Sequence, residues 1–447
     1  MKKLTVGFVT TLSGRWPNEL PEQRLREYNK WLEVEYPDIN YVHYPEIANT
    51  TERVNEVINQ FKQVSVDLVI MLYGAFTGDD VSCALAEELG VPLILWAPEE
   101  PPFERDERLL ANALVAATMN AASLHRLQKK AYVIYGNKED VAVQAKLKSL
   151  ITTYQAVRQM KGTLLGLFGY RPTAFYNSAF DEGLIRRTFG IRIEETDLKM
   201  VFDRMAEIAK PIVEKDVDYM TSTYQSGRLP VGHLENHSRL FYALQELIAE
   251  EGYDYSTIKC WPEMGKLKTT PCAAIGRLSD LDTHIVCEGD VDAAISTIAH
   301  HTLTGLPTFI TDLINIDKQD NLLTFWHCGQ AAPSLLDQDD GILMADHPLA
   351  GQGVAFYGAL KPGKVTISRF CNIGGKYKLF IMVGEAIKTK RQTCGVMVNV
   401  KIAQDVETVI EKIIAEGVPH HYSIVWQDVL AEMTMLADIL GIEVIAV

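Results

Sequence analysis

Short runs of apolar residues alternate with longer amphipathic stretches over the first 160 or so positions of the chain. Leu4 to Thr11, Val66 to Leu72 and Val91 to Trp96 are largely apolar, which predicts buried strands. Glu22 to Tyr36 and Asp79 to Leu89 repeat their apolar residues at helical spacing, which predicts helices. A strand–helix–strand order with short links is typical of a parallel, doubly wound sheet.

The same alternation continues to about residue 305 and then changes. Strands are predicted at 162–168 and at Ile191 to Glu194, followed by long helices that end with Asp290 to Thr304. Beyond residue 305, short predicted strands are separated by Gly and Pro residues and follow one another closely, as in the alternating segment Gly363 to Phe370. Closely spaced short strands of this kind predict an antiparallel barrel or sandwich. We therefore expect an α/β protein with domains at residues 1–160, 161–305 and 306–447.

The composition narrows the classes of partner. With 47% hydrophobic and 23% charged residues over 447 positions, the chain has the composition of a soluble globular protein. A net charge of −15 argues against nucleic acid and anionic membrane surfaces as partners. No apolar stretch approaches the roughly 20 residues of a membrane span, and Met1 to Val9 indicates a first buried strand rather than a signal peptide. The seven widely spaced cysteines form no CxxC pair, so we expect reduced thiols and a cytoplasmic protein.

Carboxylates follow two apolar runs at the points where the predicted strands end. Glu288 comes after Ile285–Cys287, and Asp312 ends the segment Pro307–Thr311, 24 positions later. This spacing suits adjacent parallel strands joined by one helical crossover, with both side chains at the carboxyl edge of one sheet. Either residue could instead cap a helix, although Asp290 is the better cap in its segment. Two neighbouring carboxylates repel each other, and a divalent cation such as Mn²⁺ would relieve the repulsion.

Histidines that could complete such a metal site lie further along the chain, at His327, His347 and the adjacent pair His420 and His421. Each could equally be a surface or structural residue, and the sequence leaves open which of them binds a metal. Cys328 lies beside His327, but adjacent residues in an extended segment face opposite sides, so we do not expect a cysteine nucleophile.

Two further segments carry polar residues of interest. His233 and His237 form an HxExH pattern, which lacks the glutamate position of the HExxH metalloproteases and is better explained by a helix start or a substrate contact. Trp261 and Glu263 follow a predicted helix and are expected to line the same sheet edge as Glu288. The sequence contains no GxGxxG fingerprint, P-loop or GxSxG elbow, which argues against a nicotinamide or ATP enzyme.

At these residues the chain resembles the L-fucose isomerase / L-arabinose isomerase superfamily of metal-dependent ketol isomerases. The segment Cys287–Val291 with Asp312 is similar to the fucose isomerase glutamate and aspartate that bind Mn²⁺ and exchange protons. His347-Pro348-Leu349 is similar to an arabinose isomerase segment whose histidine is a metal ligand. The tail from Gly417 to Val447 looks like the arabinose isomerase His-His tail, whose second histidine corresponds to His421.

The resemblance implies two Rossmann-like domains followed by a C-terminal antiparallel β-barrel-like domain. It implies interconversion of an aldose and its ketose through a cis-enediolate stabilised by Mn²⁺ or another divalent cation. Glu288 and Asp312 would be metal ligands and proton shuttles, and His421 the third ligand. Where arabinose isomerase has its second metal glutamate, this chain has Trp326-His327. The residues left as substrate contacts are His327, His347, Glu263, Trp261 and His420.

The resemblance also implies a homo-oligomer, a trimer or hexamer, with a small-molecule sugar as its substrate. Because the chain is shorter than those sugar isomerases, its sugar is expected to differ, and a pocket with Arg or Lys could accept an anionic substituent. Two other functions stay open. One is a non-catalytic sugar-binding or regulatory protein that retains the fold, and the other is a metal-dependent aldolase or lyase that also uses an enediolate.

Overall fold

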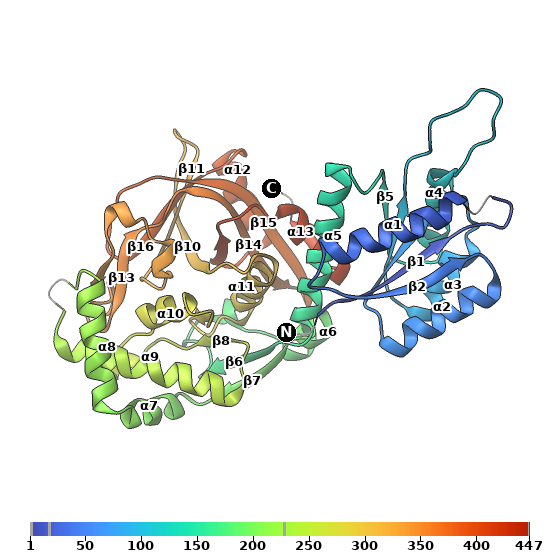
Figure 1. Cartoon of the computed structure of the whole chain (residues 1–447). Helices are drawn as coiled ribbons and strands as arrows, with labels where there is room; N and C mark the ends of the chain where they lie inside the picture. Colours follow the sequence, from blue (N-terminus) through green and yellow to red (C-terminus); the bar gives the residue numbers. More distant parts are fainter. Residues whose placement is uncertain (1–2, 17–18, 227–228, 446) are drawn as a thin grey trace. The chain divides into compact units, whose positions relative to one another are not determined.

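The computed structural model describes residues 3–16, 19–226, 229–445 and 447 (Figure 1). The chain separates into two compact units, Met1–Arg158 and Gln159–Val447. The predicted division of the second unit at residue 305 stays a prediction. Among the described residues, no helix has the length and apolar character needed to cross a bilayer.

The first unit contains one parallel sheet with the strand order β2-β1-β3-β4-β5, an order found in doubly wound sheets. Strands β1, β3 and β4 are buried along their whole length, which explains their apolar runs. The edge strand β2 was not predicted, because most of its side chains are exposed or half-buried and many are polar. The elements are β1 (Thr5–Thr11), α1 (Glu19–Glu35), β2 (Asn40–Ala48), α2 (Thr51–Val64), β3 (Leu68–Tyr73), α3 (Asp80–Leu89), β4 (Leu93–Ala97), α4 (Ala113–Arg126), β5 (Ala131–Tyr135) and α5 (Val141–Met160).

The second unit begins with a four-stranded parallel sheet of order β7-β6-β8-β9. Its strands pack against apolar faces of α7, α9 and α10 around residues such as Phe168, Leu244 and Ile258. The elements are β6 (Leu164–Phe168), α6 (Glu182–Phe189), β7 (Arg192–Thr196), α7 (Leu198–Glu207), α8 (Lys210–Thr223), α9 (Val231–Glu251), β8 (Tyr255–Ile258), α10 (Cys272–Ser279), β9 (Ile285–Cys287) and α11 (Val291–Thr304).

The rest of the second unit forms a nine-stranded mixed sheet of order β12-β13-β16-β11-β10-β17-β14-β15-β18. An additional antiparallel pairing of β15 with β16 closes six of these strands into a ring in which every neighbouring pair is antiparallel. The elements are β10 (Thr308–Asp317), β11 (Leu322–His327), β12 (Leu343–Ala345), β13 (Ala355–Ala359), β14 (Gly363–Ile373), β15 (Lys376–Ile387), β16 (Val396–Lys401), α12 (Val406–Glu416), β17 (His421–Val425), α13 (Leu430–Leu440) and β18 (Glu443–Ile445).

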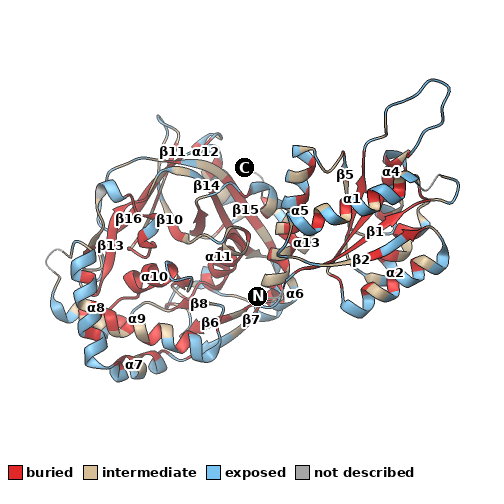
Figure 2. Cartoon of the chain, in the orientation of Figure 1, coloured by how far each residue is buried: buried red, intermediate tan, exposed pale blue. Residues whose placement is uncertain are grey.

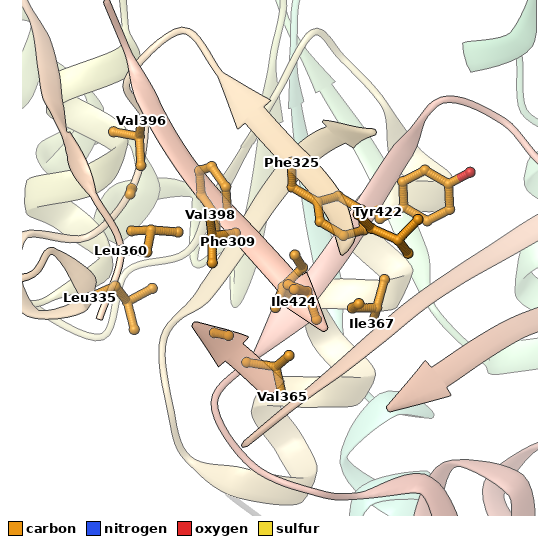
Figure 3. Packing of buried hydrophobic residues seen from close by; sticks show 14 of the residues in the cluster. Phe309, Phe325, Leu335, Leu360, Val365, Ile367, Val396, Val398, Tyr422 and Ile424 are labelled. Atoms are coloured by element: carbon orange, nitrogen blue, oxygen red, sulfur yellow. The ribbon is translucent and has the colours of Figure 1, made fainter. Parts of the chain in front are cut away.

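The inside of this ring is an apolar core built from alternate positions of each strand (Figure 3). Phe309 of β10 lies opposite Ile424 of β17, which in turn lies opposite Ile367 of β14. On the other side, Phe325 of β11 lies opposite Val398 of β16. Because side chains alternate between the two faces of a strand, residues an odd number of positions away from these face outward. Asp312 and His421 are such outward-facing residues.

The helix α11 connects the two sheets of the second unit and is buried along most of its length (Figure 2). Its buried polar side chains all have partners on the ring, as buried polar groups require. Asp292 accepts a hydrogen bond from Tyr377 at 2.7 Å, and Ser296 accepts one from the backbone N–H of Phe370 at 2.8 Å. His300 lies between two serine hydroxyls, those of Ser423 at 3.0 Å and Ser368 at 2.9 Å.

The strands that carry the two predicted carboxylates do not lie side by side, so the expected adjacent parallel strands are a wrong prediction. Glu288 follows β9 in the parallel sheet, whereas Asp312 lies inside the long antiparallel strand β10. The crossover helix is present, but α11 carries the chain from one sheet to the other instead of returning to the first. His421, expected in a loop between two helices, begins the strand β17.

Candidate functional site

Glu288 is held by an unusual turn between β9 and α11. Both Glu288 and Gly289 have left-handed backbone conformations, with φ of +64° and +61°. A Cβ on Gly289 would lie 2.3 Å from the carbonyl oxygen of Tyr170, so only glycine fits there. The left-handed conformation costs a residue such as glutamate roughly 1–2 kcal/mol. Strain of this kind is concentrated at functional sites, and here it directs the largely buried carboxylate of Glu288 toward His421.

Asp290 anchors the imidazole of His421 from the start of α11. Its Oδ1 caps the helix by accepting the backbone N–H of Ala293 at 2.9 Å. Its Oδ2 lies 2.9 Å from Nδ1 of His421, and Arg369 Nη2 donates to Oδ1 at 3.0 Å. Asp290, Arg369 and His421 are all completely buried, so this charged chain is shielded from water. Because the carboxylate accepts the Nδ1 hydrogen, Nε2 of His421 is the ring nitrogen that faces the site.

Two carboxylates converge on that nitrogen. Nε2 of His421 lies 3.4 Å from Oε2 of Glu288 and 3.7 Å from Oδ1 of Asp312. Among the described residues, neither Nε2 of His421 nor Oδ1 of Asp312 has a hydrogen-bond partner, although both atoms are buried. Ligands about 2.1 Å from one ion lie roughly 3–3.5 Å apart. One imidazole and two carboxylates at these distances fit a divalent cation, which would satisfy both orphaned atoms.

The other three candidate histidines, His327, His347 and His420, have the opposite tautomer. Nδ1 of His327 accepts the backbone N–H of Cys328 at 2.9 Å. Nδ1 of His347 accepts the N–H groups of Leu349 and Ala350 at 3.2 and 3.1 Å. When neutral, these two rings therefore carry their hydrogen on Nε2, which makes Nε2 a donor rather than a metal ligand.

His420 has the same arrangement, because Asn177 Nδ2 donates to its Nδ1 at 2.7 Å. Its ring lies against that of His421, with centroids 3.9 Å apart, and its Nε2 is 3.9 Å from Glu288. Only one of these four histidines, His421, has its Nδ1 hydrogen-bonded to a carboxylate. The hydrogen-bond directions thus separate one ligand-like imidazole from three donor-like ones.

Burial and charge act in opposite directions on the pKa values here. Burial raises the pKa of Glu288, but its contacts with His420 and His421 outweigh burial and hold that pKa well below its usual range. Burial lowers the pKa of His421, but the hydrogen bond to Asp290 and the approach of Glu288 raise it overall to about 10. Burial is also the main cause that lowers the pKa of His327 and of His347. Binding of a cation at Nε2 of His421 would therefore displace a proton.

A cavity of about 330 Å³ opens beside Glu288, within the size range of small-molecule sites. Two of the three donor-like histidines, His327 and His347, line this cavity. None of its lining residues is Lys or Arg, so the expected basic pocket is absent from this described part of the chain. Asp312, His420 and His421 do not line the cavity. The lining residues are Cys260, Trp261, Pro262, Gly265, Thr270, Pro271, Cys272, Cys287, Glu288, His327, Cys328, His347, Leu349 and Ala350.

Four of these lining residues are cysteines, which the sequence reasoning did not connect with the site. Burial raises the pKa of Cys328, and a hydrogen bond with Cys287 together with burial raises that of Cys260. These thiols stay protonated and make the cavity wall weakly polar rather than nucleophilic. His327 and Cys328, which we expected to face opposite sides of an extended segment, both line the cavity, because β11 ends at His327.

Trp261 lines the cavity and is 40% exposed, and its ring packs edge-on against Phe175. Glu263 is not among the lining residues, and its carboxylate pairs with Lys259 at 2.6 Å. Neither histidine of the HxExH pattern lines the cavity: His233 bonds Asp346, and the buried His237 contacts a guanidinium.

Sequence reasoning missed the two residues that orient His421. Asp290 was identified only as a helix cap, and Arg369 was not considered. The one available signal was the spacing of Glu288 and Asp290, two carboxylates in a Glu-x-Asp arrangement at the start of a helix. No sequence pattern indicates the role of Arg369, because its strand, β14, is distant along the chain from Asp290.

No protein-family model matches the chain. Its sequence is similar to four curated proteins named sulfoquinovose isomerase. The one from Alkalicoccus urumqiensis is 26% identical over 85% of this chain and 86% of its own length. Those from Priestia megaterium and Clostridium sp. are 24% and 27% identical, covering 99% and 88% of both partners.

These relatives support the prediction that the chain is an enzyme, a sugar isomerase. Membership of the L-fucose/L-arabinose isomerase superfamily stays a prediction. Solved structures add no argument. A periplasmic solute-binding protein from Actinobacillus succinogenes with bound D-allose is 11% identical over 68% of this chain and 92% of its own, with a TM-score of only 0.19. An arabinose-binding protein from Shewanella sp. is 11% identical over 62% and 78%, with a TM-score of 0.16.

Proposed function

We propose that this protein interconverts an aldose and its ketose with a divalent cation, such as Mn²⁺, held by Glu288, Asp312 and His421. The observation that carries the proposal is the state of the His421 ring. Its Nδ1 is bound to the buried carboxylate of Asp290, and its unpartnered Nε2 faces one oxygen of Glu288 and one of Asp312. A carboxylate behind a metal-binding histidine is the common arrangement in proteins, because it fixes the tautomer and strengthens the ligand.

The chemistry requires a proton to leave C2 of the sugar and one to arrive at C1, while the C1 carbonyl and the C2 hydroxyl exchange character. When bound, the cation supplies Lewis-acid stabilisation of the negative charge that develops on the two sugar oxygens. Glu288 is the carboxylate that lines the cavity, and in its ionised form it can take the C2 proton. We assign the second proton exchange, with the neighbouring carbon or oxygen, to Asp312, the carboxylate that faces the same ring nitrogen of His421 as Glu288 does. Positioned acid–base groups of this kind contribute about 10²–10⁴-fold to the rate.

His327 and His347 act on the sugar rather than on the cation. Their Nε2–H groups are donors, and both residues line the cavity beside Glu288. Donors held in this way orient the hydroxyl and carbonyl oxygens of a bound sugar. The protonated cysteine thiols and Trp261 complete a largely apolar wall, against which the carbon face of a sugar ring can pack.

The substrate class follows from the relatives. They are named for sulfoquinovose, an aldose that carries a sulfonate, and we propose a sugar of this anionic kind as substrate. The cavity wall lacks Lys and Arg, so the anion must meet a cation beyond the wall. Arg171 is suited to this role: its Cα would lie 3.1 Å from a Cβ on Gly289, next to Glu288, and its guanidinium lies on the rings of Tyr170 and Tyr176. Among the described residues its buried Nε has no hydrogen-bond partner.

The test is a turnover assay with sulfoquinovose and with its neutral parent aldose, each with and without added Mn²⁺ after chelator treatment. Conversion to the ketose, with exchange of the C2 proton in D₂O and no carbon–carbon cleavage, is the expected result. Cleavage products would favour an aldolase or lyase. Turnover that resists the chelator would contradict the proposed metal dependence. Binding of the sugar without turnover would favour the non-catalytic sugar-binding protein. The variant Arg171→Gln should raise KM for the sulfonated sugar alone, with the exposed Arg187→Gln as control.

A further inference from the structure

A second cluster of metal-ligating side chains lies at the opposite ends of the elements that carry the first. Asp282 lies in the turn between α10 and β9, His284 directly precedes β9, and His301 is in the last turn of α11. One ligand atom from each of the three lies within 4.8 Å of the other two. Glu288 and Asp290 are at the other ends of β9 and α11, and about 17 Å of helix separates Asp290 from His301.

The ligand atoms are spaced as the ligands of one ion would be. Nε2 of His301 lies 3.0 Å from Oδ1 of Asp282, and Nε2 of His284 lies 3.4 Å from the same oxygen. Ligands about 2.1 Å from a tetrahedral ion are separated by roughly 3.4 Å. The rings of His284 and His301 lie against each other, with centroids 4.0 Å apart, so both Nε2 atoms are directed at the same point.

The far side of each imidazole is also held. Nδ1 of His301 lies 2.7 Å from the hydroxyl of Tyr255, and Nδ1 of His284 lies 3.3 Å from the hydroxyl of Ser279. In this structure Nε2 of His284 is hydrogen-bonded to Asp282 at 3.4 Å, so it carries the ring hydrogen there. Hydroxyl groups accept as well as donate, so Tyr255 and Ser279 can each take a hydrogen from Nδ1 when an ion replaces the hydrogen on Nε2. This supporting hydrogen bond behind each ligating histidine is typical of metal sites in proteins.

The two histidines of the cluster are largely buried, whereas its aspartate is exposed to solvent. The side chains of His284 and His301 are 4% and 15% exposed, so they are rigidly placed. The side chain of Asp282 is 81% exposed, which opens the site to ions from solvent and leaves room for a water ligand. Two imidazoles and one carboxylate are softer donors than the two carboxylates and one imidazole of the first site. They favour Zn²⁺ over Mn²⁺.

We infer that Asp282, His284 and His301 form a second metal site, which binds Zn²⁺ with three protein ligands and joins the end of α11 to the start of β9. The inference does not depend on the proposed isomerase activity, because no residue is shared with the first site. A bound ion would stabilise the folded chain, since it binds ligands that the unfolded chain does not hold together.

The experiment measures Zn²⁺ bound per chain by equilibrium dialysis and elemental analysis, in a His421→Asn background that removes the central ligand of the first site. One equivalent of Zn²⁺ is expected to remain, together with a Zn²⁺-dependent rise in melting temperature. Asp282→Asn should weaken Zn²⁺ binding at least about tenfold and abolish the rise. Asparagine keeps the size of Asp282 and tolerates its left-handed backbone, φ +60°, so this variant should fold.

Two further variants make the result decisive. His301→Gln should show the same loss as Asp282→Asn, whereas Asp203→Asn, an exposed carboxylate on α7, should bind as the background does. The inference is overturned if the His421→Asn background retains no Zn²⁺, or if Asp282→Asn and His301→Gln bind it as well as the background. If His421 is not a metal ligand, the His421→Asn background will bind as much Zn²⁺ per chain as the unaltered chain. That result would contradict the proposed function, but the comparison of Asp282→Asn and His301→Gln with the background would still test the second site.

Discussion

Asp312 and His421 are directly opposite each other on the antiparallel strands β10 and β17, with Nε2 of His421 3.7 Å from Oδ1 of Asp312. Side chains of directly opposite residues project from the same face of a sheet, and backbone hydrogen bonds fix their separation. The ring of strands thus holds two of the three atoms that we propose as metal ligands. The third, from Glu288, comes from a strained turn that follows the other sheet. A site of this kind forms only when the two sheets of the second unit are correctly packed.

Replacing His421 should remove the metal, whereas replacing His347 should not. His421→Asn deletes the imidazole whose buried, unpartnered Nε2 faces Glu288 and Asp312, so we expect loss of Mn²⁺ binding and of turnover. His347→Asn removes a donor to the sugar, so it should raise KM while Mn²⁺ binding stays unchanged. Metal titration and steady-state kinetics of both variants check this. Equal Mn²⁺ affinity in His421→Asn and the unaltered chain would contradict the assignment.

Asp290→Asn should weaken metal binding without unfolding α11. Asparagine caps a helix nearly as well as aspartate, but it cannot supply the charge that holds His421 and Arg369. Loss of such a supporting residue costs about 10–100-fold in metal affinity. The matched control is Asp405→Asn, the N-cap of α12, which accepts the backbone N–H of Thr408 away from the site. Titration with Mn²⁺ should distinguish the two variants, and equal affinities would argue against an orienting role for Asp290.

Glu288→Gln should lower turnover about 10²–10⁴-fold, because an amide cannot accept the C2 proton. Glu263→Gln is the comparison, since Glu263 pairs with Lys259 and does not line the cavity. It should retain turnover within about tenfold of the unaltered enzyme. Exchange of the C2 proton in D₂O, followed by NMR, reports the step directly. Undiminished exchange in Glu288→Gln would remove Glu288 as the proton carrier.

Gly289→Ala should destabilise the protein more than Gly374→Ala. Both glycines have φ of +61°, so both substitutions carry the cost of a left-handed alanine, about 1–2 kcal/mol. A Cβ at Gly374 meets nothing within 4 Å, whereas one at Gly289 would collide with the carbonyl of Tyr170. The difference in unfolding free energy therefore isolates the collision. Gly289→Ala should also lose activity, because relief of the clash moves Glu288. Equal destabilisation by the two substitutions would contradict this account.

His237→Gln should flatten the loss of stability in acid. Burial, together with the charge of Arg277, lowers the pKa of His237 well below its ordinary 6.5. The unfolded chain therefore binds a proton below about pH 6.5 that the folded chain does not, so stability is present above that pH and lost as pH falls. The contribution is at most about 1.4 kcal/mol per pH unit. Urea unfolding of both proteins between about pH 7 and 5 checks it. Parallel pH profiles would contradict it.

The sequence alone identified most of the local structure, because short-range patterns report burial. The run Leu4 to Thr11 begins one residue before the strand β1, and Asp79 to Leu89 begins one residue before the helix α3. The alternation around Val365 and Ile367 correctly indicated an antiparallel strand, β14. The polar edge strand β2 lacks such a pattern and was missed. The strand-end carboxylates and the histidine pair also drew attention to residues that the structure brings together.

The tertiary structure alone decided which sheet each strand joins and which histidine can bind a metal. Spacing along the chain cannot distinguish a helix that returns to the same sheet from one that crosses to another, as α11 does between Glu288 and Asp312. The ligand role of His421 depends on a hydrogen bond from its Nδ1 to Asp290, which is 131 positions away. His327, His347 and His420 instead accept hydrogen bonds at Nδ1. Long-range packing sets these directions, and no local pattern of residues records them.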